Sequence, residues 1–201
     1  YSIYSFQNKK LDKAMHELNG VVLIKPILNA IQSTQRHRGL SSGILGGEKG
    51  LSDELTAEAS ILTSRFNFLA SHLPPNTLSN QSWLALFSKY QQIQSIGLNW
   101  SQEKNFTAHI DLITDLQQLM INLADHYALS TDPDLASHYL IITTLQDMPL
   151  AFEQLGQMRA YGTGILANKS VSEQQKIKMH TLLTTLTNAF DSLAVNLSKT
   201  R

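Results

Sequence analysis

The sequence predicts an all-α protein: an elongated antiparallel helical bundle made of two four-helix-bundle modules that share long helices. Apolar residues recur at helical spacing through most of the 201 positions. Alternating runs of β-branched residues, which would indicate strands, are absent. Breaks are few, so several helices are expected to be long, and a 35-residue helix spans about 50 Å. Long helices joined by short turns pack nearly antiparallel.

The first helix is predicted from about residue 5 to residue 46. Pro26 is expected to kink this helix, or to end it and begin another, because proline removes a backbone donor and its ring clashes with the preceding turn. Gly46-Gly47 is expected to stop it. Its apolar positions begin with Leu11, Met15, Leu18, Val21, Val22, Ile24, Ile27, Leu28 and Ile31.

Capping residues and prolines bound the next two helices. Ser52-Asp53-Glu54 predicts an N-terminal cap with acidic residues in the first turn of a helix that runs to about His72. Leu73-Pro74-Pro75-Asn76 is the clearest break in the sequence. A helix from about residue 81 to 99 follows, and then a break near 99 to 104. The side chains expected to point inward from this helix are Trp83, Leu84, Phe87, Tyr90 and Ile93.

The second half of the chain continues the pattern. A helix is predicted from about residue 106 to 129, followed by a turn in which Asp132 caps and Pro133 takes the first helical position. The next helical segment runs from Pro133 to about Ala167 and is expected to kink near Pro149. Ser172 and Gln175 form a capping-box pattern at the start of the last helix.

Composition argues against several classes of function. The chain has 16 Lys and Arg against 16 Asp and Glu and no run of like charge, which does not favour a nucleic-acid surface or a polybasic membrane patch. It has no cysteine, which excludes disulfides and thiolate chemistry. No stretch reaches the ~20 apolar residues of a membrane-spanning helix. Because Tyr1 is not an initiator Met, we expect the chain to be a fragment whose flanking membrane helices lie outside it.

A short motif occurs twice, at residues 35–46 and again at residues 156–167. The paired positions are Arg38 with Arg159, Ser42 with Thr163, Gly43 with Gly164, Ile44-Leu45 with Ile165-Leu166, and Gly46 with Ala167. We therefore predict one domain over residues 1–201 with an internal duplication, divided into about 1–100 and 101–201. Two copies of an arginine followed by small residues predict one shared, pseudo-symmetric site.

The spacing of the motif suggests what such a site would bind. On a helix, Arg38 and Ser42 share a face, and so do Arg159 and Thr163. Two arginines about 6 Å apart repel by roughly 3 kcal/mol at an effective dielectric of about 20, whereas an anion between them would accept charge-assisted hydrogen bonds. The candidate ligand-binding residues are Arg38, Arg159, Ser42, Thr163, Gln35 and Ser41. The glycines at 39, 43, 46, 162 and 164 are expected to let a ligand or another helix approach the backbone closely.

Ser33 to Leu45, centred on Arg38-Gly39-Leu40-Ser41, resembles the arginine-glycine-x-serine signature of the bacterial nitrate- and nitrite-sensing domain. Residues 153–160 resemble the second arginine region of the same all-helical superfamily. Residues 132–140 and 147–149 are similar to extracytoplasmic sensor regions of chemoreceptors and diguanylate cyclases. The likeness covers nearly the full chain.

This resemblance implies a periplasmic sensor domain of paired four-helix bundles, attached to a cytoplasmic signalling module. It also implies that one arginine from each helical region, Arg38 and Arg159, binds the anion. His37 stands where the family commonly has Glu, a change that can alter which anion is bound.

Other chemistry finds little support. The seven histidines form no His-X-X-X-His pair, so no metal site or cofactor is predicted. Gly-X-Ser-X-Gly and phosphate-loop motifs are absent, and no enzyme activity is expected.

The predicted function is ligand sensing in a bacterial transmembrane receptor, in which a small anion bound between helices shifts those helices, with the receptor working as a homodimer. One alternative is a helical scaffold or protein-interaction module without a small ligand, in which each arginine pairs with a local carboxylate such as Glu48 or Glu153. A sensor whose pocket lies elsewhere, near Tyr139 for instance, is another.

Overall fold

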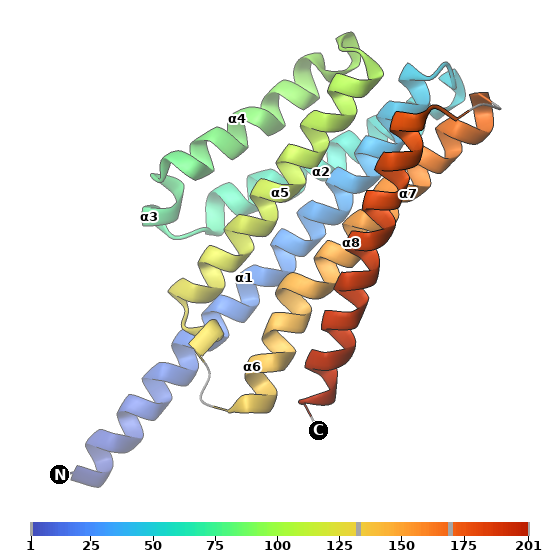
Figure 1. Ribbon diagram of the computed structural model, residues 1–201. Coiled ribbons are helices and arrows are strands. Elements are labelled where there is room, and N and C mark those ends of the chain that lie inside the picture. The colour runs from blue at the N-terminus through green and yellow to red at the C-terminus, as the bar shows by residue number, and fades with distance from the viewer. Residues whose placement is uncertain (1, 132–133, 169–170, 201) are drawn as a thin grey trace. The chain divides into compact units, whose positions relative to one another are not determined.

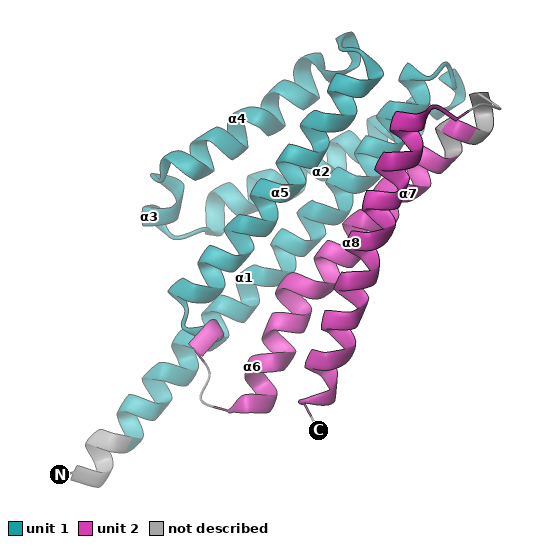
Figure 2. Ribbon diagram, viewed as in Figure 1, with its two compact units in different colours: residues 1–129 teal, residues 130–201 magenta. Residues whose placement is uncertain are grey.

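The computed structural model describes residues 2–131, 134–168 and 171–200, and the side chains of these residues except 2–6, 163, 164 and 166–168. Its regular elements are helices, and no strand occurs among the residues described, which confirms the all-α prediction (Figure 1). The chain forms two compact units, Tyr1–Leu129 and Ser130–Arg201 (Figure 2). Each is described by itself.

Unit 1 is a four-helix module. Helix α1 packs against α2 and α5, and α4 packs against α5. The helices are α1 (Ser2–Leu45), α2 (Ser52–His72), α4 (Gln81–Ile96) and α5 (Gln102–His126), with the short α3 (Pro75–Leu78) and 3-10 turns at Lys49–Leu51 and Gly97–Asn99. A further 3-10 turn, Leu129–Thr131, connects the two units along the chain. The breaks expected at the prolines 74–75 and near residue 100 are where the chain turns.

The core of unit 1 follows from the apolar faces of these helices. Phe66 of α2 stacks on Tyr90 of α4 with the ring centroids 3.9 Å apart, and the Tyr90 hydroxyl donates to Thr63 Oγ1 at 3.0 Å. This lets a buried tyrosine keep its hydrogen bond. The largest fully buried apolar side chains of the unit are Phe66, Ile27, Leu62, Leu69, Leu86, Leu112, Ile113, Leu116, Met120 and Leu123. The expectation that Leu84 points inward is wrong, because its side chain is 57% exposed and Leu86 takes the buried place.

Helix α1 continues through Pro26, so of the two outcomes expected there, a kink or an end, the end does not occur. The ring of Pro26 removes the hydrogen bond to the carbonyl of Val22, four residues earlier. Val22 is 62% exposed, so water can satisfy that carbonyl and the helix persists. The stop at Gly46-Gly47 is confirmed: α1 ends at Leu45, and Gly47 has a φ of 107°, which glycine adopts without strain.

The start of α2 differs from the prediction in its cap. Ser52 was expected to accept a hydrogen bond from the first turn, but its hydroxyl donates to the carbonyl of Lys49 at 2.9 Å. The preceding 3-10 turn causes this, because it brings the Lys49 carbonyl within reach of the hydroxyl. Asp53 and Glu54 do lie in the first turn, where they complement the positive end of the helix dipole.

Unit 2 consists of one interrupted helical rod and one continuous helix. The rod contains α6 (Leu135–Ile142), a π-helical segment (Thr143–Asp147) and α7 (Met148–Asn168), and it packs against α8 (Glu173–Ser198). The π-helical segment lies just before Pro149, where a distortion was expected. The Asp147 carboxylate, 8% exposed, accepts from Ser192 Oγ at 2.9 Å and Asn196 Nδ2 at 2.8 Å, which ties this segment to α8. The apolar contact between α7 and α8 is formed by Ala151, Leu186, Ala189 and Met158.

Two expectations for this half of the chain stay predictions. The cap expected at Asp132 lies outside the described residues, and Asp134 is the N-cap of α6, accepting from the Ser137 N–H at 2.8 Å. Unit 2 by itself is a helical hairpin. The second four-helix module and the duplication about residue 100 therefore remain predictions.

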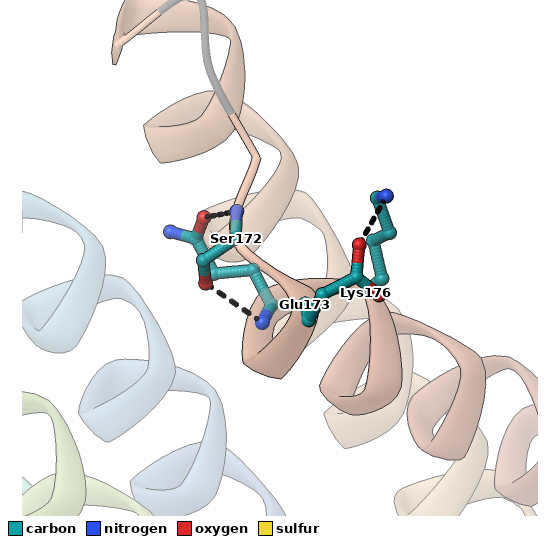
Figure 3. A network of polar contacts seen from close by, with 4 residues as sticks. Ser172, Glu173 and Lys176 are labelled. Atoms are coloured by element: carbon teal, nitrogen blue, oxygen red, sulfur yellow. Dashed lines mark hydrogen bonds and ion pairs between the residues drawn. The ribbon is translucent and has the colours of Figure 1, made fainter.

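The capping box at the start of α8 is confirmed (Figure 3). The Ser172 hydroxyl accepts from the Gln175 N–H at 3.2 Å, and the Gln175 side chain accepts from the Ser172 N–H at 2.9 Å. One turn further, Lys176 pairs with Glu173 at 2.6 Å. Two of the unpaired backbone N–H groups at this helix end are thereby satisfied.

Replacing Ser172 with alanine is expected to lower the free energy of unfolding by about 1 kcal/mol, the usual effect of losing a serine N-cap. Urea unfolding followed by circular dichroism measures it. Ser82→Ala is the matched control, because Ser82 is exposed and lies in the first turn of α4, where Asn80 is the cap. Equal destabilisation by the two substitutions would contradict the role given to Ser172.

Candidate functional site

The C-terminal third of α1 brings the first arginine motif into the interior of unit 1. Arg38 is only 3% exposed, and its guanidinium carbon lies 5.0 Å above the centroid of the Phe106 ring of α5. A buried guanidinium needs compensation for its lost hydration, and an aromatic face supplies part of it. Arg38 is therefore a buried cation held by packing from a second helix.

The hydroxyl groups next to Arg38 differ in how they are satisfied. Ser41 is fully buried, and its hydroxyl donates to the carbonyl of His37 at 2.6 Å. Ser42 Oγ is buried and has no hydrogen-bond partner. Ser42 lies one turn after Arg38 on the same face, so an unsatisfied donor accompanies the buried cation. Gln35, on the same face one turn before Arg38, is half-buried.

A pair of buried histidines lies beside this motif. His37 Nδ1 is 2.8 Å from His109 Nε2, and His109 Nδ1 is 2.7 Å from the carbonyl of Asn105. A carbonyl can only accept, so His109 carries its proton on Nδ1, and its Nε2 accepts from His37 Nδ1. His37 Nδ1 is also 3.3 Å from Ser41 Oγ, which links the pair to the arginine motif.

Burial keeps both imidazoles neutral. It lowers the pKa of His37 to about 4, although the nearby carboxylate of Glu58 acts in the opposite direction. Burial also lowers the pKa of His109 to about 3; the hydrogen bond to the Asn105 carbonyl opposes this, whereas the charge of Arg38, and that of His37 once it is protonated in acid, adds to it. At neutral pH the pair adds no positive charge to the surroundings of Arg38.

Glu58 of α2 is the buried carboxylate near this cluster. It is 4% exposed, and its Oε2 lies 3.3 Å from Nε of Arg36, whose side chain is 65% exposed. The charge of Glu58 is thus balanced by an arginine on the outer side of α1. This pair differs from those suggested by the sequence, in which the motif arginines would meet Glu48 or Glu153.

Close packing at the first motif is found at only some of its glycines. A Cβ at Gly43 would lie 2.5 Å from Leu51 Cδ1, and a Cβ at Gly46 would lie 3.2 Å from the Ser42 carbonyl oxygen. Positions 39 and 162 have nothing within 4 Å of such an atom, so no neighbouring helix approaches the backbone there, and the approach of a ligand stays a prediction. Gly164 and the side chain of Thr163 lie outside the part of the chain whose side chains the structure describes, so the predictions for them stay predictions.

The second arginine motif lies on α7 in unit 2. The Arg159 side chain is exposed, and Met158 beside it packs into the contact between α7 and α8. The neighbouring carboxylate, Glu153, is 5% exposed and accepts from Gln157 Nε2 at 2.9 Å. Arg38 and Arg159 therefore belong to different units and have different surroundings.

A groove of about 420 Å³ lies elsewhere in unit 1, between α3, α4 and α5. None of the predicted ligand-binding residues lines it. Its walls carry amide and hydroxyl groups and the ion pair of Lys89 with Asp115, whose Nζ and Oδ2 are 2.6 Å apart. The groove is thus a feature separate from the arginine motifs.

The described part of the chain has no cluster of three side chains suited to a metal ion. Within the same residues, no helix is long and apolar enough to cross a membrane.

Comparison with known families gives a match that covers most of the chain. A family described as "Nitrate and nitrite sensing" matches residues 29–200. The chain belongs to this family. Searches of the curated proteins and of the solved structures found no match.

The nitrate and nitrite sensing domain of this chain includes both arginine motifs, and it includes α1 only from residue 29 onward. The family resemblance inferred from the sequence is confirmed. Sequence reasoning missed the histidine pair, because residues 37 and 109 are 72 positions apart on different helices. It also missed Phe106 as the ring under Arg38. Phe106 is at the start of the helix predicted from about residue 106, but only the packing of α1 on α5 places its ring under an arginine.

Proposed function

We propose that this domain is the extracytoplasmic sensor of a bacterial transmembrane receptor and that it binds a small anion of the nitrate or nitrite kind. Arg38 supplies the charge, and Ser42 supplies a hydrogen-bond donor one turn away. The domain performs no catalysis. Its ligand is held by charge, hydrogen bonds and the shape of the surrounding helices.

The observation that carries this proposal is the buried arginine with a buried, unpartnered hydroxyl on the same helix face. A buried donor without a partner destabilises a protein by about 1–3 kcal/mol. An anion oxygen beside Ser42 would accept that hydrogen bond and would also interact with the guanidinium. The family to which the domain belongs senses nitrate and nitrite, and this supports a small planar oxyanion.

The remaining ligand contacts are proposed from the repeated motif. Arg159 and Thr163 are the positions that correspond to Arg38 and Ser42, and we assign them the same roles. Gln35 and Ser41 complete the group around Arg38. The hydroxyl of Ser41 contacts the carbonyl and the ring of His37. We therefore assign Ser41 two roles, positioning the motif and contacting the ligand.

We propose that the domain signals because the bound anion stabilises one packing of the helices over another. A ligand changes the balance between two packings of the helices only if it binds one of them better. Arg38 lies on α1, the longest helix among the residues described, so a small sliding or rotation of this helix can carry the change away from the site. We propose that this domain lies in the periplasm and that the receptor works as a homodimer. Membrane helices would connect the domain to a cytoplasmic signalling module.

Thermal unfolding with nitrate, nitrite, sulfate and small carboxylates tests the proposal, with chloride at equal ionic strength as the reference. A ligand present at 100 times its dissociation constant should stabilise the domain by about 2.7 kcal/mol. We expect nitrate or nitrite to raise the melting temperature in a saturable way. An equal response to every salt would contradict a specific site, and no response to any anion would favour the helical scaffold.

A further inference from the structure

The N-terminal half of α1 carries a row of apolar side chains that its own unit leaves exposed. Leu11 is 62% exposed, Met15 52%, Leu18 54% and Val22 62%. In unit 1 the first turns of α1 extend beyond α2, α4 and α5, and the turns near residues 16 to 20 meet the C-terminal end of α5 (Figure 1). The residues from 7 to 16 are all exposed, so this part of the helix has little packing of its own. A lone helical segment of this length is marginal in water.

The opposite face of the same helix is the one that unit 1 buries. His16 Nε2 lies 3.0 Å from the carbonyl of His126, and a Cβ at Gly20 would lie 2.5 Å from Tyr127 Cβ. Further along the helix, Ile27 and Ala30 on that face are fully buried. At about 100° per residue, the exposed row points nearly opposite to this buried face. The bundle of unit 1 therefore does not account for the apolar row.

The row has the spacing of a coiled-coil seam. Positions 8, 11, 15, 18 and 22 alternate by three and four residues, which makes them a, d, a, d and a of a heptad repeat. Both d positions are Leu, and one a position, Val22, is β-branched, a combination that favours two strands in parallel. Asn8 is also an a position, and an asparagine there specifies a two-stranded pairing in register.

The positions that flank the seam do not oppose self-association. The g positions are Gln7, Ala14 and Val21, and the e positions are Asp12, Asn19 and Pro26. When two parallel copies pair, each g residue meets the e residue of the next heptad, so Asp12 meets an uncharged glutamine. No like charges face each other, and the seam is complementary to itself.

We propose that this face of α1, residues 8–22, is the surface through which two copies of the chain associate as a parallel two-stranded coiled coil. The seam lies before residue 29, outside the region that matches the family, so it is a feature of this chain's own N-terminal extension of α1. Two heptads span about 21 Å, so the pairing is weak by itself and forms at high protein concentration or when both copies are held in one membrane. The biological role of the seam rests on the proposed homodimeric receptor, whereas the pairing of the two helices does not require the anion.

Cysteine cross-linking tests the seam, because the chain has no cysteine of its own. Met15→Cys and Leu18→Cys place thiols in the seam, where equivalent residues of the two helices would lie within the 4.4–6.8 Å Cα separation of a disulfide. Lys9→Cys and Lys13→Cys, at the b and f positions, are the matched controls on the outer side. We expect mild oxidation in the absence of anion to give at least tenfold more disulfide dimer for the seam variants than for the controls.

Three results would overturn the proposal. Equal cross-linking at all four positions would mean random collision. Absence of cross-linking at 15 and 18, with thiols that react freely with maleimide, would mean a monomer with an open seam. Thiols at 15 and 18 that are protected from maleimide in a monomer would mean that the seam is covered by the same chain. Arg38→Ala combined with Leu18→Cys should cross-link like Leu18→Cys alone, so failure of the anion site leaves this test unaffected.

Discussion

Replacing Arg38 with alanine is expected to weaken nitrate or nitrite binding by about 30- to 1000-fold. Removing one partner of a buried charge pair typically changes the binding free energy by about 2–4 kcal/mol, and each 1.4 kcal/mol is a factor of ten. The upper end applies if the guanidinium makes two hydrogen bonds to the anion. Isothermal titration calorimetry measures the dissociation constants of the wild type and the variant.

The controls for Arg38 separate ligand binding from folding. Arg36→Lys changes an arginine two residues away whose side chain is 65% exposed and keeps the positive charge that balances Glu58, so we expect its affinity to stay within a fewfold of the wild type. Arg38→Lys keeps the charge but not the planar fork, so it should bind more weakly than the wild type and more tightly than Arg38→Ala. Melting without ligand shows whether each variant is folded.

Arg159→Ala decides how far the repeated motif describes the site. If both arginines hold the same anion, this variant should also weaken binding by at least tenfold. An unchanged affinity would confine the ligand to the surroundings of Arg38 in unit 1. If neither arginine affected a measured affinity, the anion would bind elsewhere, and the arginine proposal would be wrong.

Acid is expected to destabilise the domain through the histidine pair. The unfolded chain takes up protons on these imidazoles near pH 6.5, whereas burial lowers the folded pKa of His37 to about 4 and that of His109 to about 3. Between these values the unfolded state binds more protons, so the free energy of unfolding decreases as the pH falls. His37 alone should account for a decrease of about 3 kcal/mol between pH 7 and pH 4. Urea unfolding over this range measures it.

Substitution identifies the pair as the cause of this acid sensitivity. His109→Gln removes one titrating group and keeps a polar side chain, so its unfolding free energy should depend less steeply on pH between 6.5 and 4. His180→Gln, at an exposed position on α8, should leave the slope unchanged. If His109→Gln and the wild type had the same slope, the pair would not be the main source of the acid sensitivity.

Local sequence signals predicted the helices because the physics of those signals is local. The Pro74-Pro75 pair, the glycines after Leu45 and the Ser172 capping box act within a few residues of themselves, and the structure has a turn, a stop or a cap at each. The exceptions arose where tertiary surroundings decided the outcome. Pro26 was tolerated because the carbonyl it leaves unpaired is on an exposed turn, and Leu84 lies on the outer side of α4.

The sequence alone determined that this chain is helical, where most of its helices begin and end, and that it resembles the nitrate and nitrite sensing family. Those properties depend on spacing along one chain. Only the tertiary structure decided that Arg38 is buried over Phe106, that the Ser42 hydroxyl is left without a hydrogen-bond partner, and that His37 meets His109. Such contacts join residues on different helices, and their energy depends on burial and distance, which appear only when the helices pack.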